Sequence, residues 1–171
     1  MINEKILLEI LKSREDRANR QEELLKKYPY SLISFTLNTP GEIKDSILYR
    51  KVHKEGIEAI RSTLGKHGVN MVFSEELHKN TGPEFYAIVD IDANSLKGLM
   101  VDIEDNHRLG RIFDIDVFDK GHNQIGRSKL GLSSRKCLIC NEDARNCMIN
   151  RTHSYEDLIK KVEEIVSTIE D

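Results

Sequence analysis

The stretch from residue 110 to 117 constrains the fold more than any other part of the chain. It reads Gly-Arg-Ile-Phe-Asp-Ile-Asp-Val, and in a strand successive side chains point to opposite faces. One face then carries three apolar side chains: Phe113, Ile115 and Val117. The other face carries Asp114 and Asp116, about 7 Å apart because a strand rises about 3.3 Å per residue. The pattern predicts a strand with one buried face and one acidic face.

Two carboxylates on one strand face are suited to a hard divalent cation. Mg²⁺ takes oxygen ligands and commonly links one or two carboxylates to substrate phosphates. Arg108 and Arg111, just before the aspartates, suit the phosphate half of that arrangement. The alternative is a strand with a solvated outer face, on which Asp is an ordinary surface residue. The spacing alone leaves both interpretations open.

Composition limits the class of protein. The 171 residues are 32% charged and 39% hydrophobic, which is typical of one globular domain with a real core. A net charge of −3 gives no general nucleic-acid surface, and we find neither an 18-residue apolar run nor a secretion signal. The three cysteines are an odd number, which argues against a disulfide framework. We therefore expect a cytoplasmic protein that binds neither membrane nor nucleic acid.

The remaining patterns predict an α+β fold with a mixed, mostly antiparallel sheet and flanking helices. Helices are expected over 3–12, 13–27, 43–67 and from residue 154 onward, and strands over 32–37, 69–73, 85–91, 99–104, 112–118 and 124–127. Ser13 resembles the start of a capping box, so the first two helices are expected to be separate. The second of them is polar until Leu24 and is expected to be solvated.

A short connection suggests that strands 99–104 and 112–118 form an antiparallel hairpin. In an even register, Asp102 and Glu104 would share the face of the two aspartates and supply a third carboxylate. In an odd register that role would pass to Asp90.

A cysteine-rich segment lies between residues 135 and 153. Its spacing is C-x2-C-x6-C-x5-H, formed by Cys137, Cys140, Cys147 and His153. Such a set is a common tetrahedral Zn²⁺ site, in which sulfur–sulfur separations stay under roughly 4 Å, and separations above about 5 Å would exclude it. Two alternatives stay open, namely buried packing cysteines and a C-x-x-C redox pair.

Six motifs, in order along the chain, resemble one family: Ser13-Arg14-Glu15-x-Arg17, Ser34-Phe35-Thr36, Pro40-Gly41-x-Ile43-Lys44-Asp45-Ser46, Thr81-Gly82-Pro83-Glu84, Leu109-Gly110-Arg111-x-Phe113-Asp114-Ile115-Asp116-Val117 and Arg135-Lys136-Cys137-Leu138-x-Cys140. The family is the apo-citrate lyase phosphoribosyl-dephospho-CoA transferases, also called holo-citrate-lyase acyl-carrier-protein synthases. The resemblance runs from about residue 13 to His153.

The resemblance implies a single nucleotidyltransferase domain over residues 1–171. Its donor would be 2′-(5″-triphosphoribosyl)-3′-dephospho-CoA, and its acceptor a serine of the acyl-carrier (γ) subunit of citrate lyase, with diphosphate released. Asp114 and Asp116 would hold Mg²⁺, and Glu104 would complete the catalytic set. Four basic residues are candidates for the donor phosphates, although each also suits a solvated surface: Lys44, Arg111, Arg127 and Arg135.

The D-x-D strand also resembles the nucleotidyltransferase superfamily. The chain departs from that pattern, because no Gly-Ser pair lies shortly before Asp114. A different class of function also fits the sequence, namely a non-catalytic carrier-protein binding module in which the cysteine segment is a structural clip.

Overall fold

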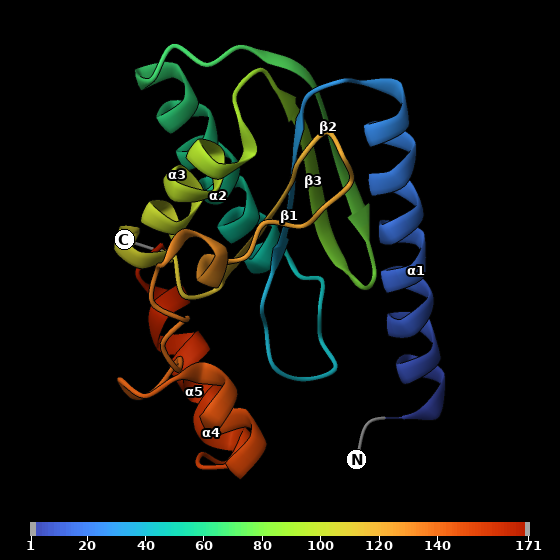
Figure 1. Cartoon of the computed structure of the whole chain (residues 1–171). Helices are drawn as coiled ribbons and strands as arrows, with labels where there is room; N and C mark the ends of the chain where they lie inside the picture. Colours follow the sequence, from blue (N-terminus) through green and yellow to red (C-terminus); the bar gives the residue numbers. More distant parts are fainter. Residues whose placement is uncertain (1–2, 170–171) are drawn as a thin grey trace.

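One four-stranded antiparallel sheet, with helices on both faces, organises the computed structural model, which describes residues 3–169 (Figure 1). The strand order is β2-β3-β1-β4. The elements are α1 (Glu4–Lys27), β1 (Ser31–Leu37), α2 (Ile47–Lys66), β2 (Met71–Lys79), β3 (Gly82–Val89), α3 (Ala93–Asn106), β4 (Phe113–Phe118), the 3₁₀ helix η1 (Arg127–Leu130), α4 (Ala144–Asn150) and α5 (Tyr155–Ser167). The α+β prediction is confirmed.

The N-terminal 24 residues after Asn3 form one continuous helix, so the predicted break at Ser13 is wrong. Ser13 lies buried within α1, and its hydroxyl accepts a hydrogen bond from Thr81 (2.8 Å) instead of capping a new helix. Asn3 is the N-cap, and the helix ends before Pro29 as expected.

The predicted strand over 99–104 is also wrong, because these residues belong to helix α3. Asp92 caps α3 by accepting a hydrogen bond from the backbone N–H of Ser95 (2.8 Å). Leu96, Met100 and Ile103 recur at helical spacing and are buried against the sheet. The expected hairpin between 99–104 and 112–118 therefore does not exist, in either register.

Several boundaries differ from the predictions; the strand expected over 85–91, for example, is β3 over Gly82–Val89. The helix expected over 43–67 starts at residue 47, because Ser46 caps it through the N–H of Tyr49. The strand expected over 69–73 extends to Lys79 through pairing with β3. The strand expected over 124–127 is reduced to a single bridge between Phe118 and Gln124.

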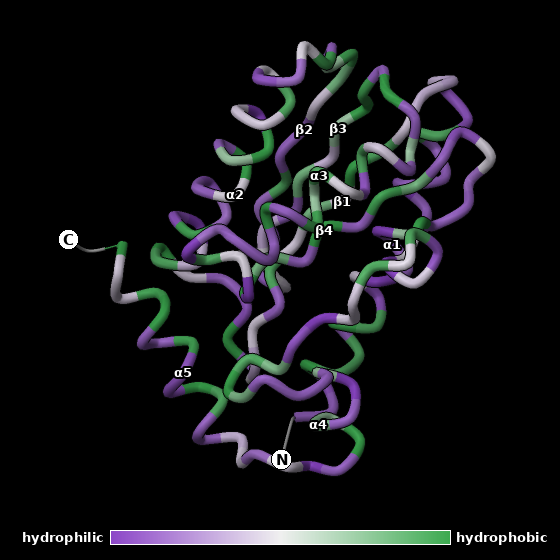
Figure 2. Tube along the Cα trace, turned by 60° about the vertical axis from the view of Figure 1, so that its left-hand side comes forward, coloured by the Kyte–Doolittle hydropathy of each residue, from purple (hydrophilic) through white to green (hydrophobic). Residues whose placement is uncertain are grey.

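The face of the sheet toward α2 and α3 is the apolar core. Eight strand residues of β1, β3 and β4 are buried there: Ile33, Phe35, Phe85, Ala87, Val89, Phe113, Ile115 and Val117. Gly56 explains how α2 approaches so closely, since a Cβ there would strike the ring of Phe35. Val162 and Val166 of α5 join the same core, and Figure 2 shows hydrophilic and hydrophobic segments alternating along α5.

The opposite face is covered by α1, which stands along one side of the sheet in Figure 1. Leu24 and Leu25, in its last turns, pack on Leu32, Tyr86 and Ile88 as a second, smaller core. The earlier turns of α1 present polar side chains to the sheet, as described below. Across the described residues, no helix combines the length and the apolarity needed to span a membrane.

Candidate functional site

The two aspartates share one face of β4, as the sequence predicts. Side chains of β4 alternate between buried and half-buried, with Asp114 and Asp116 among the half-buried ones. In the register with β1, Asp114 lies beside Thr36 and Asp116 beside Ser34. This is the face that α1 covers, so the aspartates lie between the sheet edge and the helix.

Glu104 joins the site by another route than the one predicted. It reaches the outer edge of β4 from helix α3, and its buried carboxylate accepts a hydrogen bond from the backbone N–H of Ile115 (3.1 Å). Lys97, also buried on α3, donates to the carbonyl of Ile115 (2.9 Å). The backbone of Ile115, the residue between the two aspartates, is therefore held on both sides by α3: its N–H by Glu104 and its carbonyl by Lys97.

The other two carboxylates proposed for this role lie elsewhere. Asp102 is exposed on α3 and accepts a hydrogen bond from Asn106 (2.7 Å). Asp90 follows the last residue of β3, Val89, which pairs with Ser31 at the far end of β1 from Asp114. Of the three candidates, the structure brings only Glu104 to the aspartates.

Two arginines connect Glu104 to its surroundings. Arg127 lies 3.0 Å from Oε1 of Glu104 and also 3.0 Å from Asp105. Arg135 lies 3.3 Å from Oε2 of Glu104 and 3.9 Å from Asp114. Arg135 is thus shared between the buried glutamate and the first aspartate of the D-x-D pair.

A pocket of about 260 Å³ opens beside these groups. Its lining residues are Glu104, Asp105, Arg111, Arg127, Ser133, Ser134, Arg135 and Lys136. Three of the four basic residues predicted from sequence therefore share one pocket. Lys44 lies outside it, where its ammonium donates to the carbonyl of Thr39, and burial and the nearby Arg14 lower its pKa.

The polar turns of α1 line the same sheet face, and sequence reasoning missed them. Gln21 donates to the hydroxyl of Ser34 (2.9 Å), and Arg17 lies 3.4 Å from Glu84. Tyr86 also donates to Glu84 (2.7 Å), a carboxylate only 2% exposed. The expectation that this helix is solvated therefore holds for its outer face and is wrong for the face that contacts the sheet. Residues 13, 17 and 21 lie four apart on one helical face, and that spacing was the available signal.

Asp116 is the most perturbed carboxylate of the site. Burial, with repulsion from Asp114 as the next cause, raises its pKa from 3.8 to about 6, although Lys97 opposes the shift. The amide of Gln124 donates to its Oδ1 (3.0 Å). Crowded carboxylate oxygens of this kind are the donors that hard divalent cations prefer.

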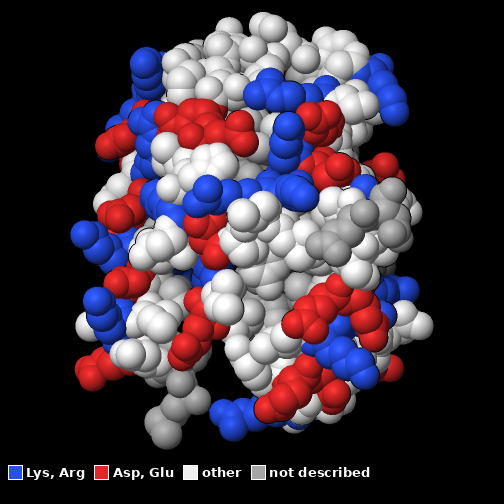
Figure 3. All heavy atoms as spheres, turned by 180° about the vertical axis from the view of Figure 1, so that it is seen from behind, with Lys and Arg blue, Asp and Glu red and all other residues white. Residues whose placement is uncertain are grey.

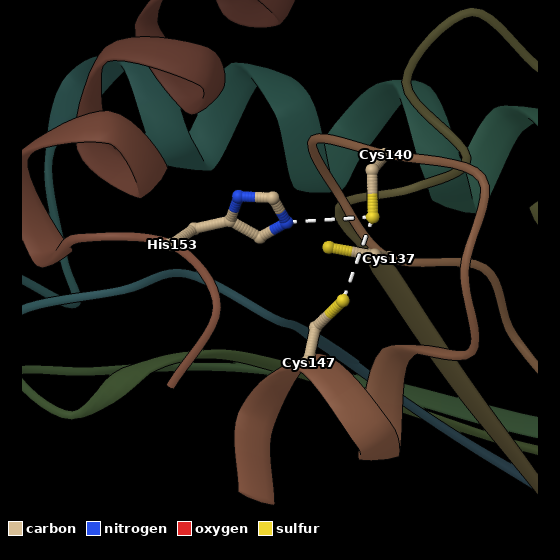
Figure 4. A group of neighbouring side chains, drawn as sticks. All are labelled: Cys137, Cys140, Cys147 and His153. Carbon is tan, nitrogen blue, oxygen red and sulfur yellow. Dashed lines mark hydrogen bonds between the residues drawn. The ribbon is translucent and has the colours of Figure 1, made fainter. Parts of the chain in front are cut away.

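The cysteine segment converges in space, as Figure 4 shows. The ligand atoms of Cys137, Cys140, Cys147 and His153 all lie within 4.8 Å of one another. Cys140 Sγ is 3.4 Å from Cys147 Sγ and 3.4 Å from Nε2 of His153. The predicted convergence is confirmed, and the cluster could hold a metal ion such as zinc.

A pair of reciprocal contacts joins this cluster to the acidic strand. Arg111 donates to the carbonyls of Cys137 (2.5 Å) and Leu138 (3.1 Å). In return, Arg135 donates to the carbonyls of Gly110 (3.3 Å) and Arg111 (3.0 Å). We call these four hydrogen bonds the arginine clasp. Gly110 is required here because a Cβ would strike the carbonyls at the end of α3.

Charge on the molecular surface is mixed. Seen from behind in Figure 3, basic and acidic side chains are interspersed over the described residues.

Together these features define an α+β protein with an arginine-lined pocket beside the aspartate pair of its edge strand. Comparison with known sequences makes the family specific: the sequence model of the apo-citrate lyase phosphoribosyl-dephospho-CoA transferases matches residues 5–169. The chain belongs to that family.

Curated relatives carry the same name. A protein of Escherichia coli O7:K1 (strain IAI39 / ExPEC), named apo-citrate lyase phosphoribosyl-dephospho-CoA transferase, is 35% identical over 95% of this chain and 88% of its own length. Proteins of that name from Escherichia coli O6:K15:H31 and Shigella boydii serotype 18 are each 34% identical over the same shares.

Proposed function

We propose that this protein attaches the prosthetic group of citrate lyase. The donor is 2′-(5″-triphosphoribosyl)-3′-dephospho-CoA, and the acceptor is a serine of the acyl-carrier (γ) subunit. Family membership over residues 5–169 supports the reaction. The observation that carries the assignment of the site is Arg135, which lies between Glu104 and Asp114 at an arginine-lined pocket.

The reaction is a displacement at phosphorus. The serine oxygen forms a bond to the α-phosphorus, the bond from that phosphorus to the bridging oxygen breaks, diphosphate leaves with the electron pair, and the hydroxyl proton is released. Such chemistry depends on positioning and on charge neutralisation rather than on covalent work by the protein. The protein therefore needs cations around the triphosphate and a fixed approach for the serine.

We assign the triphosphate to the pocket and its arginines. Arg127 and Arg135 present planar, bidentate donors there, and Arg111 lines the same wall. Glu104 holds both Arg127 and Arg135 through ion pairs, so we assign it a positioning role. Lys44, outside the pocket, is proposed to contact a phosphate in the dephospho-CoA part of this long donor.

Asp114 and Asp116 are proposed to hold Mg²⁺. The fit rests on their shared face and on the raised pKa of Asp116, which burial and then repulsion from Asp114 cause and which a bound cation would offset. When bound, the cation supplies charge neutralisation on the transferring and leaving oxygens. Asp114 also orients Arg135 toward the same space.

We propose that the Cys₃His cluster holds a structural Zn²⁺. Three thiolates and one imidazole are a common tetrahedral set. The Sγ atoms of Cys140 and Cys147 are 3.4 Å apart, and all four ligand atoms lie within 4.8 Å, below the separation of about 5 Å that would exclude the site. Purified protein is expected to carry about one equivalent of zinc, and its chelation to lower the melting temperature.

Incubation with donor, Mg²⁺ and apo carrier subunit tests the function, with intact mass of the carrier and release of diphosphate as readouts. We expect the carrier to gain the mass of the phosphoribosyl-dephospho-CoA group. Asp114→Asn is the negative control. A complex with the carrier that leaves its mass unchanged would instead identify a non-catalytic binding module.

A further inference from the structure

The segment that carries half of the pocket has almost no hydrophobic core of its own. Among residues 131–153, all of which the structure describes, only Cys137 and Cys147 are buried. Both belong to the Cys₃His cluster. We call residues 131–153 the cysteine lobe.

The pocket is built from two parts. Glu104, Asp105, Arg111 and Arg127 come from α3, the turn before β4 and η1. Ser133, Ser134, Arg135 and Lys136 come from the cysteine lobe. The first part rests on the main core, since Ile103 and Ile112 beside it are buried there. The second part has the ligand cluster as its buried centre.

A short backbone path leads from the cluster to the pocket. Cys137 N donates to the carbonyl of Glu142 (2.7 Å), and Ala144 N donates to the carbonyl of Arg135 (2.9 Å). Arg135 is thus fixed to the same small ribbon that presents Cys137 and leads into α4. The arginine clasp then ties this ribbon to residues 110 and 111, just before the aspartates.

We infer that the metal in the Cys₃His centre assembles the donor pocket by holding the cysteine lobe, and with it Arg135, against β4. A lobe without an apolar core takes its folding free energy from metal ligation, as small zinc domains do. Loss of the metal loosens the lobe and withdraws Arg135, while the sheet and its core remain folded. This inference rests on the proposed zinc site and on the proposed role of the pocket.

Inorganic triphosphate binding to the full-length protein tests the inference without the transfer reaction. Cys147→Ser removes one ligand, and Met148→Ser, an exposed neighbour on α4, is the matched control. We expect Cys147→Ser to lose zinc and to bind triphosphate about 10–100-fold more weakly, the value of one charge-assisted arginine contact. Hydrogen exchange should speed up over 131–153 but not over β1. Met148→Ser should match the wild type in all three measurements.

A second variant tests the clasp itself. Arg111→Met is expected to keep its zinc, because Arg111 is not a ligand, and yet to weaken triphosphate binding about tenfold and raise exchange over 131–140. With carrier, donor and Mg²⁺ present, removal of the zinc should raise KM for the donor more than it lowers kcat.

The outcomes separate this inference from the proposed function. Unchanged triphosphate affinity and exchange in zinc-free Cys147→Ser would overturn the inference, as would wild-type protein that takes up no zinc. Metal-dependent triphosphate binding without any mass gain on the carrier would uphold the inference and contradict the proposed function. Equal transfer by zinc-bound and zinc-free protein would uphold the proposed function and contradict the inference.

Discussion

The two faces of the sheet use the same strands for opposite purposes. On β1, Ile33 and Phe35 point into the core under α2 and α3, whereas Ser34 and Thr36 point toward α1. The first face is apolar across β1, β3 and β4, where Ile33, Phe35, Phe85, Ala87, Val89, Phe113, Ile115 and Val117 are buried. The second face is apolar only beneath the last turns of α1 and is acidic and hydroxylated near Asp114. Strand alternation therefore places the core residues and the candidate site residues on opposite faces of the same strands.

The helices that cover the two faces differ in the same way. Helix α2 buries Val52, Ile57, Ile60 and Leu64 along its length. Helix α1 buries Leu24 and Leu25 at one end only, and its polar turns contact the sheet through Arg17 and Gln21. Helix α1 is therefore held to the sheet by apolar packing at one end and by polar contacts along its preceding turns.

The largest effect is expected from a truncation on the apolar face. Phe35→Ala should lower the free energy of unfolding by about 3–5 kcal/mol, since a fully buried ring leaves a cavity among Gly56, His53 and Phe113. Urea unfolding measures the change. Thr36→Ala, the next residue on the opposite face, is the control and should cost well under half as much. Equal losses would contradict the division of roles between the faces.

The next effect is expected on activity rather than on stability. Asp114→Asn and Asp116→Asn should each lower transfer by about 10²–10³-fold, the usual size for removing one preorganised charge at a phosphoryl site. Circular dichroism should stay native, because the side chains lie outside the main core. Asp102→Asn, on the exposed side of α3, is the matched control and should transfer normally. Wild-type rates from either site variant at saturating Mg²⁺ would remove the aspartates from the mechanism.

A third effect concerns acid stability of the apolar face. Burial lowers the pKa of His53 from 6.5 to about 4, and its ring stays neutral beside the carbonyl of Phe35 (3.3 Å). The folded state therefore binds the proton less readily than the unfolded chain, so stability is full above pH 6.5 and falls toward pH 4. The loss by pH 4 is on the order of 3 kcal/mol, because the pKa of His53 is lowered by about 2.5 and each pKa unit is worth about 1.4 kcal/mol. In His53→Leu, the melting temperature should fall less between pH 6.5 and pH 4 than it does in the wild type. An equal fall in melting temperature in the variant and the wild type would assign the loss of stability in acid to other groups.

The smallest effect has the opposite sign and belongs to the α1 face. The pKa of Asp116 is raised from 3.8 to about 6, so the folded state holds this proton more tightly than the unfolded chain does. Its contribution is present below pH 3.8 and is lost as the pH rises through about 6. With divalent ions chelated, Asp116→Asn should melt above the wild type at pH 8 and together with it near pH 3. A variant that melts below the wild type at pH 8 would show that the charge is stabilised.

Sequence patterns predicted the parts of the molecule in which neighbouring residues decide the outcome. The strand with Asp114 and Asp116 follows from alternation, and the cysteine cluster follows from ligand spacing, because all four ligands lie within 17 residues. Three of the four predicted basic residues meet in one pocket. These features need little knowledge of distant parts of the chain.

The wrong predictions concern segments whose structure depends on contacts with residues far away in the sequence. Residues 99–104 alternate like a strand. They form part of a helix because Leu96, Met100 and Ile103, which share one helical face, pack against the sheet. Glu104 was therefore predicted beside the aspartates for a reason that does not hold. The polar turns of α1 read as solvated, because local sequence does not reveal that Ser34 and Glu84 lie opposite Gln21 and Arg17.

The hold of α3 on Ile115 has a consequence for the behaviour of the protein in concentrated solution. β4 is an edge strand, and an edge with free N–H and C=O groups is a template for strand addition and aggregation. Glu104 occupies the N–H of Ile115, and Lys97 occupies its C=O, so a second chain cannot add a continuous ladder there. The glutamate that orients the arginines of the pocket therefore also protects this edge of the sheet from strand addition.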